Sequence, residues 1–498
     1  MGRVIFNEDP NHFIFDRARA GFTEISEKDC RDFIMQYAGT DITDFMICVN
    51  ASIAWYDSVR VKNIIEQYEE WKSAGKSIPE FHGYIKLLTD FYKKHGKVPQ
   101  DIWIDALREA GIRPWTSIRM NDIHESDAED SVIFSDFYRE NRHKNRASHR
   151  KAASYYENGL DYTYAEVRAH SLALIEDVLE RFDTDGLELD WMREIYSVGI
   201  GREYEGIAVI NSFMRAVKAL VRRAEKARGH SISVAVRLPA TPEKALRLGF
   251  DVFDWVENGL VNLITVTPRW SSTDNGMPID LWKRTFAGKN VTIAAGLEIL
   301  IDAYNRRGRK YKAHTYETAV ASACANLWQG ADATYLFNFM DTACAGREQS
   351  FCTGENGRSF LSAVGDLARC TAEKRRHIVT YSDVSAIGAE SAKPLPARVS
   401  AGSFAAFRLV TGEIPAGREV NVVFGVAAGG DFASDEAEVY VSARKCIYAG
   451  ERAPRAQQYA DMRYFAYTVL NDGTLPPVSV IEAGGVECTL HWVEIEIN

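Results

Sequence analysis

The sequence predicts a (β/α)8 barrel followed by an all-β antiparallel sandwich domain. Eight short apolar runs, rich in valine, isoleucine and aromatic residues, recur along the first 340 residues. Helical segments lie between several of these runs, and strands that alternate with helices form parallel sheets. After about residue 390, short alternating strands and turns replace the helices. We therefore expect the barrel over residues 1–385 and the sandwich over residues 386–498.

The eight apolar runs are the candidate barrel strands. Each is short enough for a strand, and eight parallel strands with helical crossovers close a barrel. A doubly wound open sheet is the alternative, but no GxGxxG sequence follows the first run, which weakens it. In chain order, the runs lie within residues 3–15, 43–56, 111–122, 185–191, 230–240, 260–270, 290–298 and 331–341.

Several of the helices between these strands have recognisable first residues. Thr163 and Glu166 have the spacing of a capping box. Thr241 followed by Pro242 is typical of a helix start, with the proline at the first helical position. Thr315 is expected to cap the helix that precedes the last barrel strand. These helices are the crossovers that a parallel barrel requires.

Two segments do not fit a simple strand and helix repeat. The segment 57–110 is helical in pattern but too long for one crossover, so we expect it beside the barrel or over its rim. The segment 366–385 is expected to hold the last barrel helix and a linker. The runs beyond it alternate apolar and polar residues, which is typical of strands with one buried face.

Composition argues against several classes of partner. The net charge of −10 and the pI of about 5.7 argue against a nucleic-acid or anionic-membrane partner. The eight cysteines form no CxxC pair, so we expect no thiolate zinc site, and their density suits a reduced cytosolic protein. We find neither a signal sequence nor a membrane-spanning run, and we expect a cytoplasmic protein, although a secreted form without its signal peptide would read the same.

The short stretch GLELD at residues 186–190 places two acids on one face of a strand. Side chains of a strand alternate, so Leu187 and Leu189 are expected to face the helices while Glu188 and Asp190 point into the barrel. Catalytic groups of such barrels lie at the C-terminal ends of the strands. Asp190 is therefore expected near the mouth, and Glu188 deeper in the barrel.

A buried carboxylate needs a charged or hydrogen-bonding partner. A sugar ligand needs several polar side chains around it. We expect Glu188 to pair with Arg119 or Arg237. Glycoside hydrolysis uses two carboxyl groups that flank the scissile bond, and Asp190 could face Glu298 of the seventh strand across the mouth. The catalytic candidates are Asp190 as nucleophile or base, Glu298 as acid and Glu188 in reserve, together with Asp122. The candidate substrate-binding residues are Asn50, Arg119, Asn121, Asp122, His124, Arg193, Arg237, Trp270 and Asn338.

The motif DGLELDW at residues 185–191 resembles the fourth-strand motif of the α-amylase and α-galactosidase superfamilies of barrel glycosidases. The position that matches their nucleophile is Asp190. Together with the runs at 5–9, 117–124 and 249–268, it is similar to bacterial glycoside-hydrolase-like barrel proteins with a C-terminal β-sandwich. The resemblance implies a carbohydrate substrate and a catalytic role for Asp190.

The sequence also departs from well-known patterns. Chitinases have a catalytic glutamate where this chain has Met192, and the α-amylase family has an arginine where this chain has Glu188. The fifth strand offers no carboxylate for the α-amylase type of acid. These departures leave the reaction class better indicated than the role of each carboxylate.

Our leading hypothesis is a glycoside hydrolase, an enzyme that cleaves an oligosaccharide or glycan-derived glycoside without a metal or cofactor. A metal-dependent sugar isomerase or lyase on the same barrel is one alternative, and a non-catalytic carbohydrate-binding barrel protein is another. The expected partner is a carbohydrate, not a nucleic acid or a membrane, and assembly into a homo-oligomer is left open.

Overall fold

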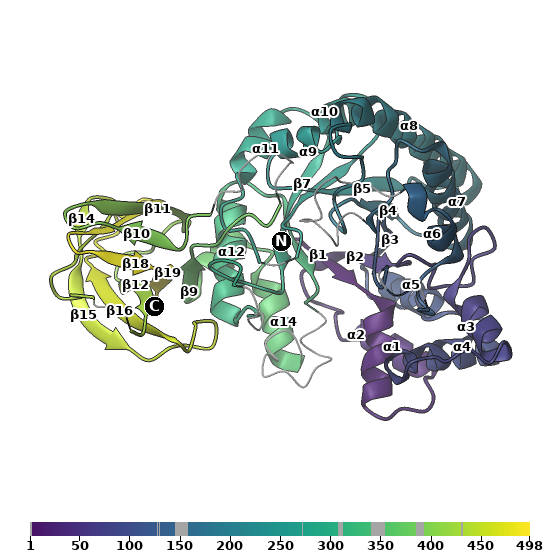
Figure 1. The fold of residues 1–498 in the computed structure, drawn as a ribbon, viewed down its shortest axis with the longest axis horizontal. Coiled ribbons are helices and arrows are strands. Elements are labelled where there is room, and N and C mark those ends of the chain that lie inside the picture. The colour runs from purple at the N-terminus through teal and green to yellow at the C-terminus, as the bar shows by residue number, and fades with distance from the viewer. Residues whose placement is uncertain are drawn as a thin grey trace.

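The computed structural model describes residues 2–126, 128, 130–144, 158–270, 272–306, 312–339, 354–384, 393–429 and 432–498. In these ranges, the chain forms a barrel with surrounding helices and a separate β domain, which Figure 1 shows to one side of the barrel. The β domain lies beside α12 in that view.

Eight parallel strands close into a barrel in chain order, and β1 pairs with β8 to complete it. The prediction of a (β/α)8 barrel is confirmed. A small apolar cluster, which includes Ile5, Trp115 and Tyr335, fills the interior. The strands are β1 (Val4–Glu8), β2 (Ile42–Cys48), β3 (Arg113–Arg119), β4 (Gly186–Asp190), β5 (Ser233–Leu238), β6 (Leu263–Val266), β7 (Thr292–Glu298) and β8 (Ala333–Phe337).

Helices follow the strands and cover the outside of the barrel (Figure 1). The crossover and rim helices are α1 (Pro10–Arg19), α2 (Glu27–Met35), α6 (Asp136–Glu140), η2 (Arg142–Lys144), α7 (Ala165–Arg181), α8 (Glu203–Arg228), α9 (Pro242–Arg247), α10 (Val252–Glu257), α11 (Ile279–Thr285), α12 (Tyr316–Trp328), α14 (Gly354–Ala363) and α15 (Leu367–Ala372).

Two of the three predicted helix caps are confirmed. Thr241 accepts the backbone N–H of Lys244, with Pro242 at the first helical position, and Thr315 forms a capping box with Thr318. The predicted box at Thr163 is wrong. Helix α7 begins one residue later, after Tyr164, whose side chain makes no capping hydrogen bond, and the Thr163 hydroxyl instead accepts a hydrogen bond from Arg202 at 3.1 Å.

The long segment 57–110 forms a helical insertion between β2 and β3. It contains α3 (Ile64–Ser73), η1 (Glu80–His82), α4 (Tyr84–His95) and α5 (Pro99–Glu109). Helix α4 packs against α1 and α3, and α5 packs against α2. Figure 1 shows this group at the lower right of the barrel, next to α1 and α2. The insertion thus lies at the side of the barrel where α1 leaves β1.

The C-terminal domain consists of antiparallel sheets, as predicted. A five-stranded sheet has the order β15-β16-β12-β19-β9, and a four-stranded sheet has the order β11-β17-β13-β14. Strands β10 and β18 form a two-stranded sheet. The bounds are β10 (Ala397–Val399), β11 (Phe404–Val410), β12 (Val420–Ala427), β13 (Glu438–Val441), β14 (Arg444–Lys445), β15 (Ile447–Arg452), β16 (Met462–Val469), β17 (Val478–Gly484), β18 (Cys488–Leu490) and β19 (Trp492–Ile497).

The segment expected to be a linker contributes a strand to this domain. Strand β9 (Arg375–Ile378) pairs antiparallel with β19 at the edge of the five-stranded sheet. This strand thus joins the five-stranded sheet although it precedes residue 385. The predicted boundary between residues 385 and 386 itself falls outside the described residues.

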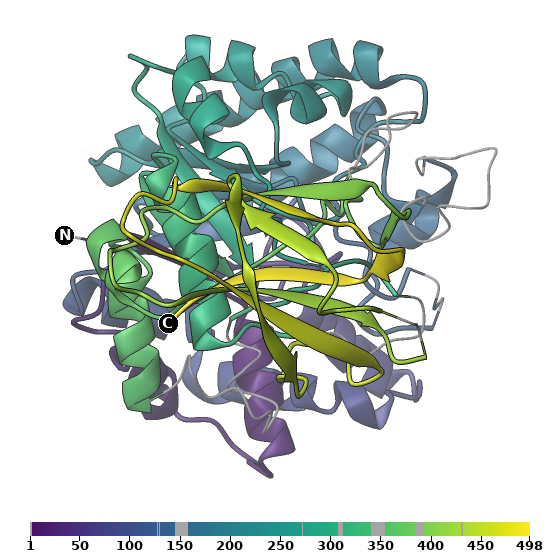
Figure 2. The ribbon, with the colours of Figure 1, turned by 90° about the vertical axis from the view of Figure 1, so that its left-hand side faces the viewer.

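The two domains share a packed junction. Ile301 and Ala303, which follow β7 of the barrel, belong to the apolar core of the β domain. The Tyr459 hydroxyl of the β domain donates a hydrogen bond to Asp302 at 3.2 Å. Figure 2 shows the molecule from the side of the β domain, which lies in front of the barrel in this view. Within the described residues, no helix is both long and apolar enough to cross a membrane.

Candidate active site at the barrel mouth

The alternation predicted for β4 is confirmed. Leu187 and Leu189 belong to the large apolar cluster that includes the helices. Glu188 points inward, because its carboxylate reaches side chains of three other barrel strands. Asp190 faces the same way, since it contacts Arg237 of β5, and the two residues are register partners in the sheet.

Glu188 is held by neutral donors and not by an arginine. Its Oε1 accepts hydrogen bonds from the Ser117 hydroxyl at 2.7 Å, the Tyr335 hydroxyl at 2.9 Å and the Asn7 amide at 3.4 Å. The predicted contact with Arg119 or Arg237 is therefore wrong. Burial and the adjacent Asp190 raise the pKa of Glu188 to about 7. This carboxyl can hold a proton near neutral pH.

Asp190 takes the ion pair that was expected for Glu188. Arg237 Nη1 donates to Asp190 Oδ2 at 2.6 Å. The other oxygen, Oδ1, accepts the backbone N–H groups of Met192 and Arg193 at 2.9 and 3.0 Å. Asp190 is almost fully buried. Three donors thus hold this carboxylate in place at the end of the strand.

Arg237 links the inward-facing acids. Burial lowers the pKa of Arg237, but Asp190, Tyr335, Glu188 and Glu298 raise it by more, so that the net shift is upward. Its guanidinium also lies over the ring of Phe337, with 3.8 Å between the charge centre and the ring centroid. Arg237 therefore sits in the field of carboxylates from both β4 and β7.

Glu298 is buried at the end of β7 and is held by Asn338, which follows β8. The Asn338 amide donates to Glu298 Oε1 at 3.0 Å and to Oε2 at 3.3 Å. The backbone N–H of Ile299 adds a further donor to Oε1 at 3.1 Å. The structure thus brings the predicted catalytic residue Glu298 together with one predicted substrate-binding residue.

A second charged network runs around the rim. Arg119 contacts Asp9 at 2.7 Å and Asp122 at 3.3 Å. Asp122 accepts from His124 Nδ1 at 2.7 Å, while Arg193 Nη2 lies 2.6 Å from His124 Nε2. Arginine only donates, so Nε2 is the acceptor and Nδ1 carries the hydrogen that bonds Asp122. The network fixes the orientation of the His124 ring.

The rim network extends to residues that the sequence did not single out as site residues. Glu194 contacts Arg269 at 2.9 Å and Arg193 at 3.5 Å. Asp383 accepts the backbone N–H groups of Arg269 and Trp270 at 2.9 and 2.7 Å, which fixes the start of that loop. Asp9, Glu194 and Arg269 could have been selected by their position just after predicted strands.

A pocket of about 320 Å³ opens above these networks. Five predicted substrate-binding residues line it, whereas Asp190, Glu188, Glu298 and Arg237 are not among the lining residues. The lining consists of Asp9, Asn11, His12, Phe15, Ala51, Trp55, Phe81, Tyr84, Arg119, His124, Glu125, Ile133, Arg193, Trp270 and Asn338. The pocket thus combines aromatic surfaces with charged and amide groups, a composition typical of ligand sites.

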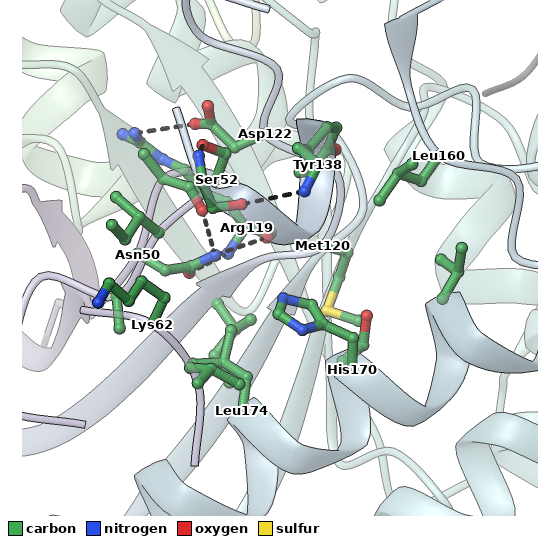
Figure 3. Close-up of a pocket in the computed structure, with 18 of the residues that line it drawn as sticks. Asn50, Ser52, Lys62, Arg119, Met120, Asp122, Tyr138, Leu160, His170 and Leu174 are labelled. Atoms are coloured by element: carbon green, nitrogen blue, oxygen red, sulfur yellow. Dashed lines mark hydrogen bonds and ion pairs between the residues drawn. The ribbon is translucent and has the colours of Figure 1, made fainter. Parts of the chain in front are cut away.

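Two other predicted binding residues brace the backbone. Asn50 accepts the Arg119 N–H at 3.0 Å and donates to the Arg119 carbonyl at 3.0 Å. Asn121 accepts from the Tyr138 hydroxyl and the Leu160 N–H, both at 2.8 Å. Figure 3 shows Asn50, Arg119 and Asp122 around a smaller cavity of about 40 Å³ behind the rim. Both amides hold the scaffold of the site.

Three residues at the mouth have positive φ angles although they are not glycine. They are Glu125 at 57°, Glu194 at 56° and Asn338 at 60°. Glu125 and Asn338 line the pocket, and Glu194 belongs to the rim network. Side chains rarely adopt this conformation, and such residues concentrate at functional sites. The loops after β3, β4 and β8 therefore carry backbone strain where they border the pocket.

Comparison with known proteins gives distant similarities only. No family model matches the chain, and no curated protein matches it. The solved structures include a cycloisomaltooligosaccharide glucanotransferase of Paenibacillus sp., with 8% identity, 100% of this chain and 56% of that chain covered, and a TM-score of 0.33. An α-L-fucosidase isoenzyme 2 of Paenibacillus thiaminolyticus has 12% identity, with 75% of this chain and 51% of that chain covered and a TM-score of 0.43.

A third solved structure, the PgaB (BpsB) glycoside hydrolase domain of Bordetella bronchiseptica, has 9% identity, with 73% of this chain and 99% of that chain covered and a TM-score of 0.44. The chain spans about half the length of the glucanotransferase and of the fucosidase. At these scores, none of the similarities assigns an activity to the chain. The barrel is established by its own strand pairing.

Proposed function

We propose that this protein is a glycoside hydrolase that cleaves an oligosaccharide or a glycan-derived glycoside at the mouth of its barrel. The main support is the position of carboxylates from β4 and β7 around Arg237, together with Asn338, which holds Glu298 and lines a pocket that has aromatic side chains. Carboxyl pairs perform glycoside hydrolysis, and aromatic faces stack on sugar rings. The proposed partner is a carbohydrate. A cytoplasmic location and homo-oligomerisation stay predictions from the sequence.

Asp190 is the proposed nucleophile or base. This role needs a positioned carboxylate, and Arg237 together with two backbone N–H groups orients that of Asp190. Glu298 is the proposed acid, oriented by the amide of Asn338. Glu188 is the reserve, because its raised pKa lets it hold a proton near neutral pH. The roles proposed for Asp190 and Glu298 require that the substrate extends from the pocket to the buried ends of β4 and β7.

The rim residues would bind and orient the sugar. Arg119, His124, Arg193 and Asn338 line the pocket and carry donors suited to hydroxyl groups. Trp270 offers an indole ring, and Asp383 holds its backbone in place. Such prealigned groups lower the entropy cost of reaching the transition state.

Hydrolysis is tested with the purified full chain and a panel of 4-nitrophenyl glycosides and oligosaccharides, with and without EDTA. We expect release of nitrophenol or new reducing ends, and turnover that EDTA leaves intact. Binding without bond cleavage across the panel would contradict the proposal and favour a carbohydrate-binding barrel protein. Conversion of a sugar without cleavage, lost with EDTA and restored by a divalent ion, would favour the metal-dependent isomerase or lyase.

A further inference from the structure

The helical insertion brings an aromatic wall to the pocket. Phe81 of η1 is 64% exposed and yet lines the pocket. Phe15 of α1 packs against it, with 5.3 Å between the ring centroids. Tyr84 of α4 meets Phe15 edge-on at 5.5 Å and stacks on Trp55 at 5.9 Å with an interplanar angle of 12°. Four rings from separate elements thus pack in one continuous row that ends at the exposed Phe81, and we call this row the aromatic wall.

Phe81 presents its ring at the edge of the pocket. A large exposed ring at the edge of a pocket is typical of a ligand contact. Phe15 packs against this ring, Tyr84 packs against Phe15, and Trp55 stacks on Tyr84. The exposed ring of Phe81 suits the C–H face of a pyranose ring.

The wall also offers hydrogen-bonding groups that other described residues do not use. Trp55 is 2% exposed, and its indole N–H has no hydrogen-bond partner in the described part of the chain. The Asn11 side-chain oxygen also has no hydrogen-bond partner in the described part of the chain, and Asn11 lines the same pocket. Buried donors and acceptors are normally paired. Within the described residues, these two groups thus lie unpaired behind the pocket lining.

The wall and the rim network border the same pocket. Asp9 and Arg119 line it together with Phe81, while Arg193, Trp270 and Asn338 complete the lining. A ring that rests on the wall would therefore be continuous with a ring held near the strand ends. The pocket volume of about 320 Å³ is in the range of small-molecule sites.

We propose that the aromatic wall of Phe15, Trp55, Phe81 and Tyr84 is a separate sugar-binding subsite that holds a further pyranose ring of the substrate. This inference rests on the proposed function and deepens it. The substrate class is then an oligosaccharide of two or more rings, and not a single sugar with a small aglycone. Phe81 is the residue that determines preference for the longer chain.

The test compares chain lengths in Phe81→Ala, Phe81→Tyr and the wild type. Probes are glucose-, N-acetylglucosamine- and xylose-based oligosaccharides of two to six rings and the matching 4-nitrophenyl monosaccharides. Binding is followed by calorimetry, and cleavage by reducing-end release. Phe253→Ala is the matched control, because Phe253 is 42% exposed on α10 and packs on Phe286, away from the pocket lining.

We expect Phe81→Ala to reduce the ratio of kcat/KM for the longest to the shortest cleaved probe by about tenfold, or 1.4 kcal/mol. Phe81→Tyr keeps the ring and should keep the ratio, as should Phe253→Ala. If the ratio is unchanged in Phe81→Ala while cleavage persists, the subsite is refuted and the hydrolase stands. If chain-length-dependent binding is lost in Phe81→Ala but no variant cleaves any probe, the subsite stands and the hydrolase fails. Absence of binding to every probe overturns both.

Discussion

The barrel and the β domain each contain a buried cluster of arginine and carboxylate side chains, and the surroundings of the two clusters differ. In the barrel, Arg237 pairs with Asp190 next to Glu188. In the β domain, Arg376 pairs with Glu494 at 2.9 Å, next to Glu496. Burial and a neighbouring carboxylate raise the pKa of both Glu188 and Glu496 to about 7. The two acids share this pKa shift, although Glu496 also pairs with Arg452 at 2.7 Å and Arg455 at 3.1 Å.

Their hydrogen bonding separates them. Glu494 accepts from Arg376, Trp492 and Gln458, and Arg376 also donates to Gln457. In the barrel, Arg237 Nε and Nη2 have no hydrogen-bond partner among the residues that the structure describes, whereas in the β-domain cluster the donor without one is the neutral Gln457 Nε2. The barrel cluster also lies at the ends of parallel strands, where Arg193 and Asn338 line the pocket. A raised pKa thus reports burial, whereas unused charged donors at the ends of the barrel strands favour a site.

The largest expected effect comes from breaking the β-domain cluster. Glu494→Gln leaves Arg376 with a weaker partner inside the protein, because a neutral amide replaces the carboxylate. We expect the free energy of unfolding of the β domain to fall by about 3–5 kcal/mol, while turnover by folded protein stays unchanged. Urea denaturation measures the free energy of unfolding, and the glycoside assay measures turnover. Lost turnover at full folding would show that this cluster takes part in catalysis.

The pH dependence of stability gives the next largest effect. The pKa of Glu188 rises from 4.5 in the unfolded chain to about 7 in the folded one, so its contribution to stability is complete below pH 4.5. That contribution falls as the pH rises through 7, by about 3 kcal/mol in total. Glu188→Gln should flatten this part of the stability curve, and it should also change the pH profile of turnover.

Glu496→Gln is the control for that experiment. Its pKa shift has the same sign, so this variant should also flatten the stability curve between pH 4.5 and 7. The pH profile of turnover should match the wild type. Identical turnover profiles in Glu188→Gln and the wild type would contradict a role for Glu188 at the active site.

A smaller effect is expected at the strained loop after β8. Asn338→Gly keeps the φ of 60° at no steric cost but removes the amide that holds Glu298. We expect turnover to fall about tenfold, since Glu298 loses the amide that orients it and a hydrogen bond contributes roughly 0.5–1.5 kcal/mol, while the melting temperature changes little. Ser442→Gly, at a φ of 49° in the β domain, should leave turnover alone. Wild-type turnover in Asn338→Gly would exclude this positioning role.

Local periodicity explains what the sequence could predict. The alternation in β4 and the caps at Thr241 and Thr315 depend on residues that are neighbours in the chain. Strand β9 was not predicted, because it is four residues long and is stabilised by pairing with β19, more than 100 residues away. Thr163 has the capping pattern, but Arg202 takes its hydroxyl in the fold.

In the site too, sequence spacing could not predict which side chains contact one another. Spacing placed Glu188 and Asp190 on one face, but the choice of which acid meets Arg237 is set by the register of β4 and β5, which pairs Asp190 with Arg237. The aromatic wall needs an insertion folded against α1, so no local pattern predicts Phe81 beside Phe15. The pairing of Asp190 with Arg237 depends on strand register, and the contact of Phe81 with Phe15 depends on tertiary packing.

The measurement that tests the central claim most directly is turnover of a cleaved glycoside by Asp190→Asn, per folded molecule, beside Glu494→Gln. Both variants replace an arginine-paired carboxylate with an amide, so both are expected to lose stability. We predict that Asp190→Asn loses about a thousandfold or more in kcat, as expected for an essential catalytic group, while Glu494→Gln does not. Turnover by folded Asp190→Asn within about tenfold of the wild type would contradict catalysis by the carboxylates at the barrel mouth.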